Sequence, residues 1–228
     1  MKKIAFFDID KTIYNGYVIF PLAEYQLRKS IIDQSCFDAL NNDLKLYKTG
    51  KVDYESTIAH LLDHWAVGLK GQNYQYILEE TKNFFHDEGN KFYNFLEPLL
   101  QVLRPKYDIF FVTGETKFVG EATNLKFLSN GYISSKLELE DEIFNGEVGH
   151  YLAKRDEKYQ AILSLLKEYE VESSLAFGDS EGDIQMLSAV GNAICINATD
   201  GLSKYARKNN WHITTPDEVV DLVETLIK

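Results

Sequence analysis

Five short runs of apolar residues along the chain have the pattern expected of buried β-strands. They are almost continuously hydrophobic rather than alternating, which is typical of parallel strands covered on both faces. The runs are KIAFFDI from residue 3, DIFFVT at 108–113, SSLAFGD at 173–179, NAICIN at 192–197 and WHIT at 211–214. Helical patterns lie between several of them, as in KYQAILSLLKEY, where Tyr159, Ile162, Leu166 and Tyr169 follow a 3.6-residue period. This alternation predicts an α/β fold with a doubly wound, mostly parallel sheet.

Residues 15–95 interrupt the alternation. They contain helix-like stretches such as PLAEYQLRKSII and YESTIAHLLDHW but no convincing strand pattern. We therefore predict a helical cap domain over 15–95, inserted after the first strand, and a core domain formed by 1–14 and 96–228. A second interruption, LELEDEIFNGEVG at 137–149, alternates in hydrophobicity and contains Asn145-Gly146, which favours tight hairpin turns. We expect a β-hairpin there.

Composition limits the classes of partner. The 228 residues carry a formal net charge of −11, whereas nucleic-acid binding needs clustered cations, so we expect no nucleic-acid partner. A small anionic substrate is still compatible with this charge, because one local cation or metal outweighs the global field. The basic start meets Asp8 too soon for a signal peptide, and no stretch approaches the about 18 apolar residues of a membrane span. With Cys36 and Cys195 read as free thiols, these features predict a cytoplasmic protein with no membrane partner.

Acidic residues follow two of the predicted strands. Asp8 and Asp10 end the first strand on one face of it, and Asp179 and Asp183 bracket a Ser-Glu-Gly turn after another. Each pair alone is compatible with a turn or a helix cap. In a parallel sheet, however, the carboxyl ends of the strands meet at one edge, where four carboxylates repel one another unless a divalent cation lies among them. Oxygen ligands suit Mg²⁺, so the pattern favours a magnesium site.

Two further segments offer groups that suit a phosphoryl oxygen. Thr113 and Gly114, in DIFFVTGETK, supply a hydroxyl and a backbone N–H at a third strand end, although an ordinary turn explains them equally well. A lysine would neutralise the remaining negative charge. Lys154 and Lys158, in AKRDEKYQAI, are the candidates, while a solvated surface position is the usual one for a lysine.

In order along the chain, these segments resemble the four motifs of the haloacid dehalogenase superfamily. The motifs are DIDKT at 8–12, FFVTGE at 110–115, the lysine of DEKYQAI, and GDSEGD at 178–183. The tail, VGNAICINATDGLSKYARKNNWHI, resembles the phosphoserine-phosphatase-like branch in particular. The resemblance implies a Rossmann-like catalytic core with a helical cap, and it spans nearly the whole chain.

Roles for individual residues follow from the resemblance. It implies that Asp8 is the nucleophile that forms an aspartyl-phosphate and that Asp10 is the general acid and base. It implies that Thr113, with Gly114, binds the phosphoryl oxygens and that Lys158 holds nucleophile and phosphate together. Mg²⁺ would be held by Asp8, the Asp10 carbonyl and Asp179, with Asp183 orienting the outer shell.

The presence of Asp10 together with Asp179 and Asp183 favours phosphoryl transfer over dehalogenation, which needs neither. The sequence therefore predicts an Mg²⁺-dependent phosphatase that acts on a small phosphorylated metabolite. Two alternatives stay open: a phosphotransferase that uses the same aspartyl-phosphate, and a non-catalytic binding protein with this fold. Nothing in the sequence predicts the oligomeric state.

Phosphoserine is disfavoured as the substrate. Phosphoserine phosphatases typically have a glutamate soon after the first motif and an arginine in the cap, but this chain has no glutamate before Glu24 and no arginine near His60. Tyr14, Tyr17 and Phe20 suggest either an apolar, ring-stacking wall or ordinary core packing. His60 and His64 have metal-ligand spacing on a helix, but without supporting ligands they are interpreted as structural.

Overall fold

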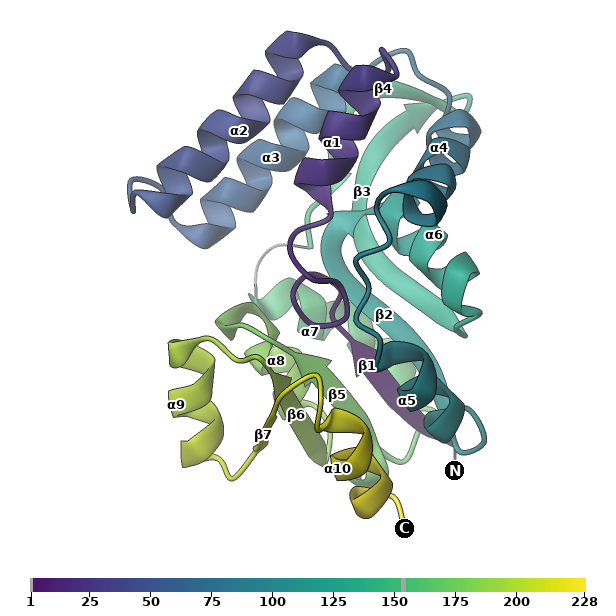
Figure 1. Ribbon diagram of the computed structural model, residues 1–228, viewed down its shortest axis with the longest axis vertical. Helices are drawn as coiled ribbons and strands as arrows, with labels where there is room; N and C mark the ends of the chain where they lie inside the picture. The colour runs from purple at the N-terminus through teal and green to yellow at the C-terminus, as the bar shows by residue number, and fades with distance from the viewer. Residues whose placement is uncertain (1, 153–154) are drawn as a thin grey trace.

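The computed structural model describes residues 2–152 and 155–228 and is built on one seven-stranded sheet (Figure 1). The strands are β1 (Lys3–Phe7), β2 (Tyr107–Thr116), β3 (Gly131–Glu140), β4 (Ile143–His150), β5 (Leu175–Gly178), β6 (Asn192–Ile196) and β7 (His212–Thr214). They lie in the order β4-β3-β2-β1-β5-β6-β7, and every neighbouring pair except β3–β4 is parallel. The predicted α/β fold with a mostly parallel sheet is confirmed.

Helices cover both faces of this sheet. The core helices are α5 (Leu96–Leu103), α6 (Lys117–Phe127), α7 (Arg155–Leu166), α8 (Ile184–Ser188), α9 (Asp200–Lys208) and α10 (Val219–Leu226). In β1, Ile4 and Phe6 pack in one apolar cluster with residues of α7, α8 and α9. Ala5 and Phe7 pack in the other cluster, with residues of α5, α6 and α10. Successive residues of a strand point to opposite faces, so a near-continuous apolar run is what a doubly covered strand requires.

The segment predicted as a cap contains four helices and no strand of the sheet. They are α1 (Ile19–Arg28), α2 (Gln34–Lys48), α3 (Tyr54–Leu69) and α4 (Tyr74–Asp87). Three of them begin at polar N-caps, because the side chains of Asp33, Asp53 and Asn73 accept backbone N–H bonds of the first turn. The division into core and cap stays a prediction, since α3 packs on β4 and α4 on α6.

The β3–β4 hairpin forms, but its turn is not where Asn145-Gly146 suggested. Glu140 pairs with Ile143, and the two residues between them, Asp141 and Glu142, have φ values of 49° and 65°. Positive φ at both central residues is the geometry of a two-residue hairpin turn. The Asn145-Gly146 dipeptide lies inside β4, where the register of the ladder shifts and Gly146 has a φ of 96°.

Over the described residues, each helix is too short or too polar to cross a bilayer. Cys36 and Cys195 are buried free thiols. The first half of β3 was not predicted as a strand, because its sequence GYISSK has few apolar residues; it pairs in parallel with β2 through Gly131, Tyr132 and Ile133.

The register of the central strands places the acidic strand ends side by side. Phe7 is the register partner of Phe177 in β5, and their rings stack with centroids 4.2 Å apart and an interplanar angle of 5°. The backbone N–H of Asp8 continues the pairing by donating to the Phe177 carbonyl at 3.0 Å. Asp8 therefore leaves the sheet beside the chain that leads to Asp179.

The Phe7–Phe177 stack predicts a large stability effect. Phe177→Ala should lower the free energy of unfolding by about 3–5 kcal/mol, since it removes a fully buried ring and leaves a cavity. Tyr76→Ala, which deletes a ring that is 45% exposed on α4, should cost less than about 1 kcal/mol. Urea denaturation followed by circular dichroism measures both, and equal losses would contradict the assigned role of the stack.

Candidate active site

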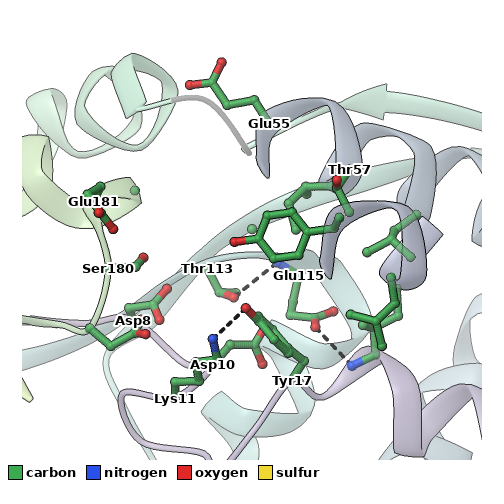
Figure 2. Close-up of a pocket in the computed structure, with 18 of the residues that line it drawn as sticks. Asp8, Asp10, Lys11, Tyr17, Glu55, Thr57, Thr113, Glu115, Ser180 and Glu181 are labelled. Atoms are coloured by element: carbon green, nitrogen blue, oxygen red, sulfur yellow. Dashed lines mark hydrogen bonds between the residues drawn. The ribbon is translucent and has the colours of Figure 1, made fainter. Parts of the chain in front are cut away.

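The carboxyl ends of β1, β2 and β5 open into a cavity of about 500 Å³. Asp8 and Asp10 enter it after β1, Thr113 and Glu115 from the end of β2, and Asp179 after β5. Residues of α1, α2 and α3 form its opposite wall. Figure 2 shows Asp8, Asp10 and Thr113 gathered in one region, while Glu55 of α3 lies across from them with its carboxylate directed away. The structure thus brings the residues singled out in three separate motifs to a single site.

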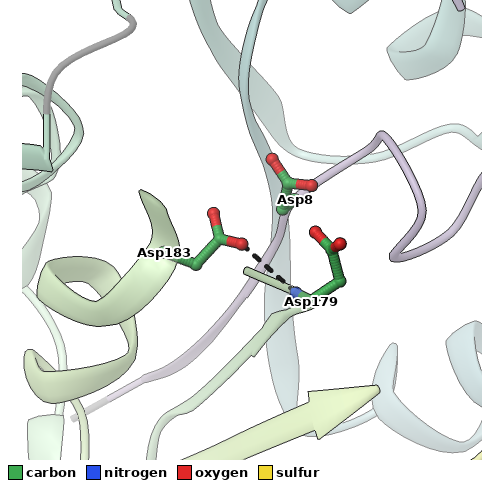
Figure 3. Close-up of side chains that lie close together, drawn as sticks. All are labelled: Asp8, Asp179 and Asp183. Carbon is green, nitrogen blue, oxygen red and sulfur yellow. Dashed lines mark hydrogen bonds between the residues drawn. The ribbon is translucent and has the colours of Figure 1, made fainter. Parts of the chain in front are cut away.

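Three carboxyl groups form the acidic centre of this site. Asp8, Asp179 and Asp183 each offer an oxygen atom, and these atoms lie within 4.8 Å of one another (Figure 3). All three side chains are buried. Buried carboxylates at this separation are the oxygen-rich environment that a hard divalent cation prefers, so the donor set fits Mg²⁺.

Lys158 is the cation of the cluster. Its Nζ donates to Asp8 Oδ1 and to Asp183 Oδ1, both at 2.7 Å, and only 7% of the residue is exposed. Thr12 adds a further hydrogen bond, from its hydroxyl to Asp8 Oδ2 at 3.2 Å. Of the two lysines considered from the sequence, Lys158 thus lies in the site, whereas Lys154 lies outside the described residues.

One lysine does not balance three buried carboxylates. Burial, followed by the charge of Asp183, raises the pKa of Asp8 to about 7, although Lys158 opposes the shift. Burial and the charges of Asp183 and Asp8 raise the pKa of Asp179 to about 9. Burial is the larger cause of both shifts, and the neighbouring carboxylates add to it; a bound cation would offset the part that comes from these charges.

Asp183 holds the loop that carries Asp179. While its Oδ1 faces Lys158, its Oδ2 accepts the backbone N–H of Asp179 at 3.2 Å and that of Ser180 at 3.3 Å. Both oxygens are therefore engaged by hydrogen-bond donors. This arrangement fits the outer-shell orienting role that the resemblance implied for Asp183.

Asp10 faces away from the acidic centre, toward the start of α1. Its Oδ1 accepts the backbone N–H of Val18 at 2.9 Å, and its carboxyl group also hydrogen-bonds that of Glu115. Burial and the nearby charge of Glu115 raise the pKa of Asp10 well above its usual value. The predicted metal contact of Asp10 is through its carbonyl and stays a prediction.

Thr113 is oriented by its own strand end. Its Oγ1 accepts the backbone N–H of Glu115 at 3.1 Å, within a buried turn. A hydroxyl that accepts one hydrogen bond keeps its own hydrogen for another partner, and here the hydroxyl lies in the cavity wall. Gly114 lines the same wall. Both residues can therefore face an anion bound above Asp8.

Three contributions were not found from the sequence: the contacts of Glu115, those of Thr12, and the pair formed by Lys11 and Tyr17. Lys11 has a φ of 59°, in the region that glycine adopts most readily. Its Nζ donates to the Tyr17 hydroxyl at 2.7 Å and lies 4.2 Å from the ring centroid. The contacts of the Lys11 side chain offset part of the strain of this left-handed backbone.

The aromatic residues near the first motif were expected either to form a cavity wall or to pack in the core, and both roles occur. Tyr17 and Phe20 line the cavity, whereas Tyr14 is fully buried and packs against Phe85 and Phe92. A structural role also suits His60 and His64, because among the described residues neither histidine joins a group of potential metal ligands. His64 instead lies 3.4 Å from Asp43 on the neighbouring helix.

Comparison with known proteins agrees with these motifs. The family model of haloacid dehalogenase-like hydrolases matches residues 5–188. The chain is 34% identical over 92 residues to a probable phosphatase of Mycobacterium tuberculosis strain H37Rv, and equally to an uncharacterized protein of strain CDC 1551. That segment is 40% of this chain and 32% of each relative, so the match spans about a third of the curated relatives' length.

Solved structures share the fold across almost the whole chain. A protein of unknown function from Bordetella pertussis Tohama I has a TM-score of 0.75 at 19% identity, covering 95% of this chain and 99% of that one. A phosphoserine phosphatase, solved as an analogue of its phospho-aspartyl intermediate, has a TM-score of 0.67 at 19% identity, covering 94% and 93%. At these identities, the likeness shows the fold alone.

The raised pKa of Asp179 predicts how stability depends on pH in the presence of a chelator. Its folded value of about 9 exceeds the value of 3.8 expected when unfolded, so the stabilisation is present below pH about 4 and is lost as pH rises toward about 9. Asp179→Asn should therefore unfold at higher urea concentration than the wild type at pH about 8, and should lose less stability between pH about 5 and 8.

Urea titrations in EDTA at several pH values make this comparison. Glu224→Gln removes an exposed carboxylate of α10 and serves as the matched control, with a pH dependence expected to follow the wild type. If the Asp179→Asn and wild-type curves run parallel, the raised pKa assigned to Asp179 is wrong.

Proposed function

This chain belongs to the haloacid dehalogenase-like hydrolase family, and from that premise we propose that it is an Mg²⁺-dependent phosphatase of small phosphomonoesters. The observation that carries the proposal is the buried cluster in which Lys158 binds both Asp8 and Asp183 beside Asp179. The relative named a probable phosphatase supports it. The absence of a bilayer-crossing helix among the described residues is compatible with the proposed cytoplasmic location.

In the first step, Asp8 is the nucleophile. A carboxylate oxygen of Asp8 forms a bond to phosphorus while the bond from phosphorus to the ester oxygen breaks, which gives an aspartyl-phosphate. Asp10 supplies a proton to the departing alkoxide, so the product leaves as an alcohol. Thr113 and the backbone of Gly114 bind the phosphoryl oxygens, and Lys158 holds Asp8 against the phosphate.

In the second step, water releases the phosphate. Asp10, now deprotonated, takes a proton from a water molecule whose oxygen forms a bond to phosphorus as the bond to Asp8 breaks. Inorganic phosphate leaves, and both aspartates return to their starting states. Hydrolysis rather than transfer to another alcohol follows if water is the acceptor that reaches the aspartyl-phosphate.

The acidic centre is the proposed magnesium site. Asp8, Asp179 and the Asp10 carbonyl would hold the ion, with Asp183 fixing the loop that carries Asp179. When bound, Mg²⁺ would supply positive charge that offsets the carboxylates and the phosphate together.

The wall opposite the acidic centre suggests the kind of leaving group. Its apolar residues are Ile19, Phe20, Leu44, Ile58, Leu61 and Leu62. Asp53 and Glu55, near the start of α3, add negative charge, and none of the described α1–α3 residues that line the cavity is basic. We propose a substrate whose leaving group is apolar or carries a ring and has no carboxylate, which disfavours phosphoserine.

The nucleophile is tested with an aryl phosphate. Wild-type protein should release phosphate from 4-nitrophenyl phosphate when Mg²⁺ is added and lose this activity in EDTA. Asp8→Asn, which keeps the side-chain shape but removes the attacking oxygen, should lower kcat at least about a thousandfold. Asp108→Asn, a substitution outside the cavity, is the control. Substantial activity in Asp8→Asn would rule out the aspartyl-phosphate.

The leaving-group proposal is tested with two aryl phosphates that differ in charge. We expect kcat/KM for 4-methylphenyl phosphate to exceed that for 4-carboxyphenyl phosphate about tenfold, although the carboxylated phenol is the better leaving group. A double variant, Asp53→Asn with Glu55→Gln, should narrow the difference, and asparagine preserves the N-cap of α3. A preference for the carboxylated ester would contradict the proposal.

A further inference from the structure

Glu115 is a buried carboxyl group in the cavity that the proposed mechanism does not use. It lies near the end of β2, two residues after Thr113, and is 6% exposed. It lines the cavity together with Asp10, whose carboxyl group it contacts (Figure 2). We propose, on the basis of the proposed function, that Glu115 is a positioning residue that holds the Asp10 carboxyl group in place for proton transfer to the leaving alcohol.

Glu115 and Asp10 bind consecutive backbone N–H groups. Asp10 Oδ1 accepts from Val18 at 2.9 Å, and Glu115 Oε1 accepts from Ile19 at 3.1 Å. The two carboxyl groups also hydrogen-bond each other. These N–H groups belong to the start of α1, where backbone donors lack partners within the helix and where the helix dipole favours negative charge. The Asp10 side chain is therefore fixed from two sides.

Asp10 lies in a loop, whereas Glu115 lies in a strand of the sheet. Asp10 lies beyond the end of β1, in the segment that leads to α1, where its backbone forms an isolated bridge to Tyr14 of the same segment. Glu115 belongs to β2, which pairs with β1 on one side and β3 on the other. A contact to Glu115 thus ties the side chain of a loop residue to the end of a central strand. Proton transfer depends on such placement, because its rate falls steeply when the reacting groups are displaced.

A purely structural role for Glu115 is the competing explanation, since the same carboxyl group attaches α1 to the sheet. The two explanations differ in which reactions they affect. Proton donation matters most when the leaving group is a poor one, such as an alkoxide, and least when it is a stabilised phenolate. Loss of structure alone lowers the rate for both kinds of ester by the same factor.

The experiment compares a simple alkyl phosphate with 2,4-dinitrophenyl phosphate in Glu115→Ala. The parameter is kcat/KM, which reports on steps up to the departure of the alcohol and not on the later hydrolysis of the aspartyl-phosphate. We expect kcat/KM for the alkyl ester to fall at least tenfold further than for the dinitrophenyl ester. Glu115→Gln, whose carbonyl can still accept from Ile19 and whose amide N–H can replace the carboxyl contact by donating to Asp10, should restore most of the loss.

Two controls separate this effect from others. Glu121→Ala removes a carboxylate that accepts hydrogen bonds from Tyr74 and Tyr132 outside the cavity, and should leave the ratio between the two esters unchanged. In an Asp10→Asn background, Glu115→Ala should cost little more, because the group it positions is already gone. If Glu115→Ala does not fold, Glu115→Met fills a similar volume without accepting hydrogen bonds and serves the same comparison.

The inference is overturned if Glu115→Ala or Glu115→Met slows both esters equally, leaves both unchanged, or is not rescued by glutamine. These outcomes are distinct from failure of the proposed function. If the wild type hydrolyses neither ester, or if Asp8→Asn is as active as the wild type, the phosphatase proposal fails as a whole. An active wild type with an unchanged ester ratio in Glu115→Ala removes only the positioning role.

Discussion

Carboxyl groups gather at one buried edge of the sheet, and their mutual repulsion decides what else the site must contain. Asp8, Asp179 and Asp183 lie together because β1 and β5 are parallel neighbours and end at the same level. Burial of like charges is unfavourable, and Lys158 compensates only part of it. The stacked Phe7 and Phe177 beneath the cluster supply apolar burial that holds the strands in register against this repulsion.

Part of this site could be predicted because it follows from a rule of topology. Asp8 and Asp179 are far apart in sequence, yet each ends an apolar run, and parallel strands bring such ends together. Lys158 is harder to predict, because nothing local distinguishes a helix lysine that reaches a carboxylate 150 residues away from one in solvent. The four motifs in order supplied that information through the resemblance.

The features of the site that could not be predicted depend on contacts that leave no periodic pattern in the sequence. Glu115 was visible next to Thr113 in the sequence, but its partners, Asp10 and the N–H of Ile19, become neighbours only once α1 is placed over the sheet. Tyr14 and Tyr17 likewise look alike in the sequence, whereas one is core and the other lines the cavity. The hairpin turn was misplaced because Asn145-Gly146, a strong turn signal, is used here inside a strand.

The charge of the site also couples the proposed binding of Mg²⁺ to the proposed binding of a phosphomonoester. With every group ionised, the three carboxylates and the Lys158 ammonium leave about two negative charges, but the raised pKa values of Asp8 and Asp179 mean that protons take up part of this charge when no cation is bound. A phosphomonoester dianion alone therefore binds beside carboxyl groups that must stay partly protonated, while a divalent cation stabilises their ionised forms. Each ligand lowers the electrostatic cost of binding the other, and by linkage the coupling is reciprocal. Under the proposed function, this coupling is a physical reason for Mg²⁺ to favour substrate binding as well as chemistry.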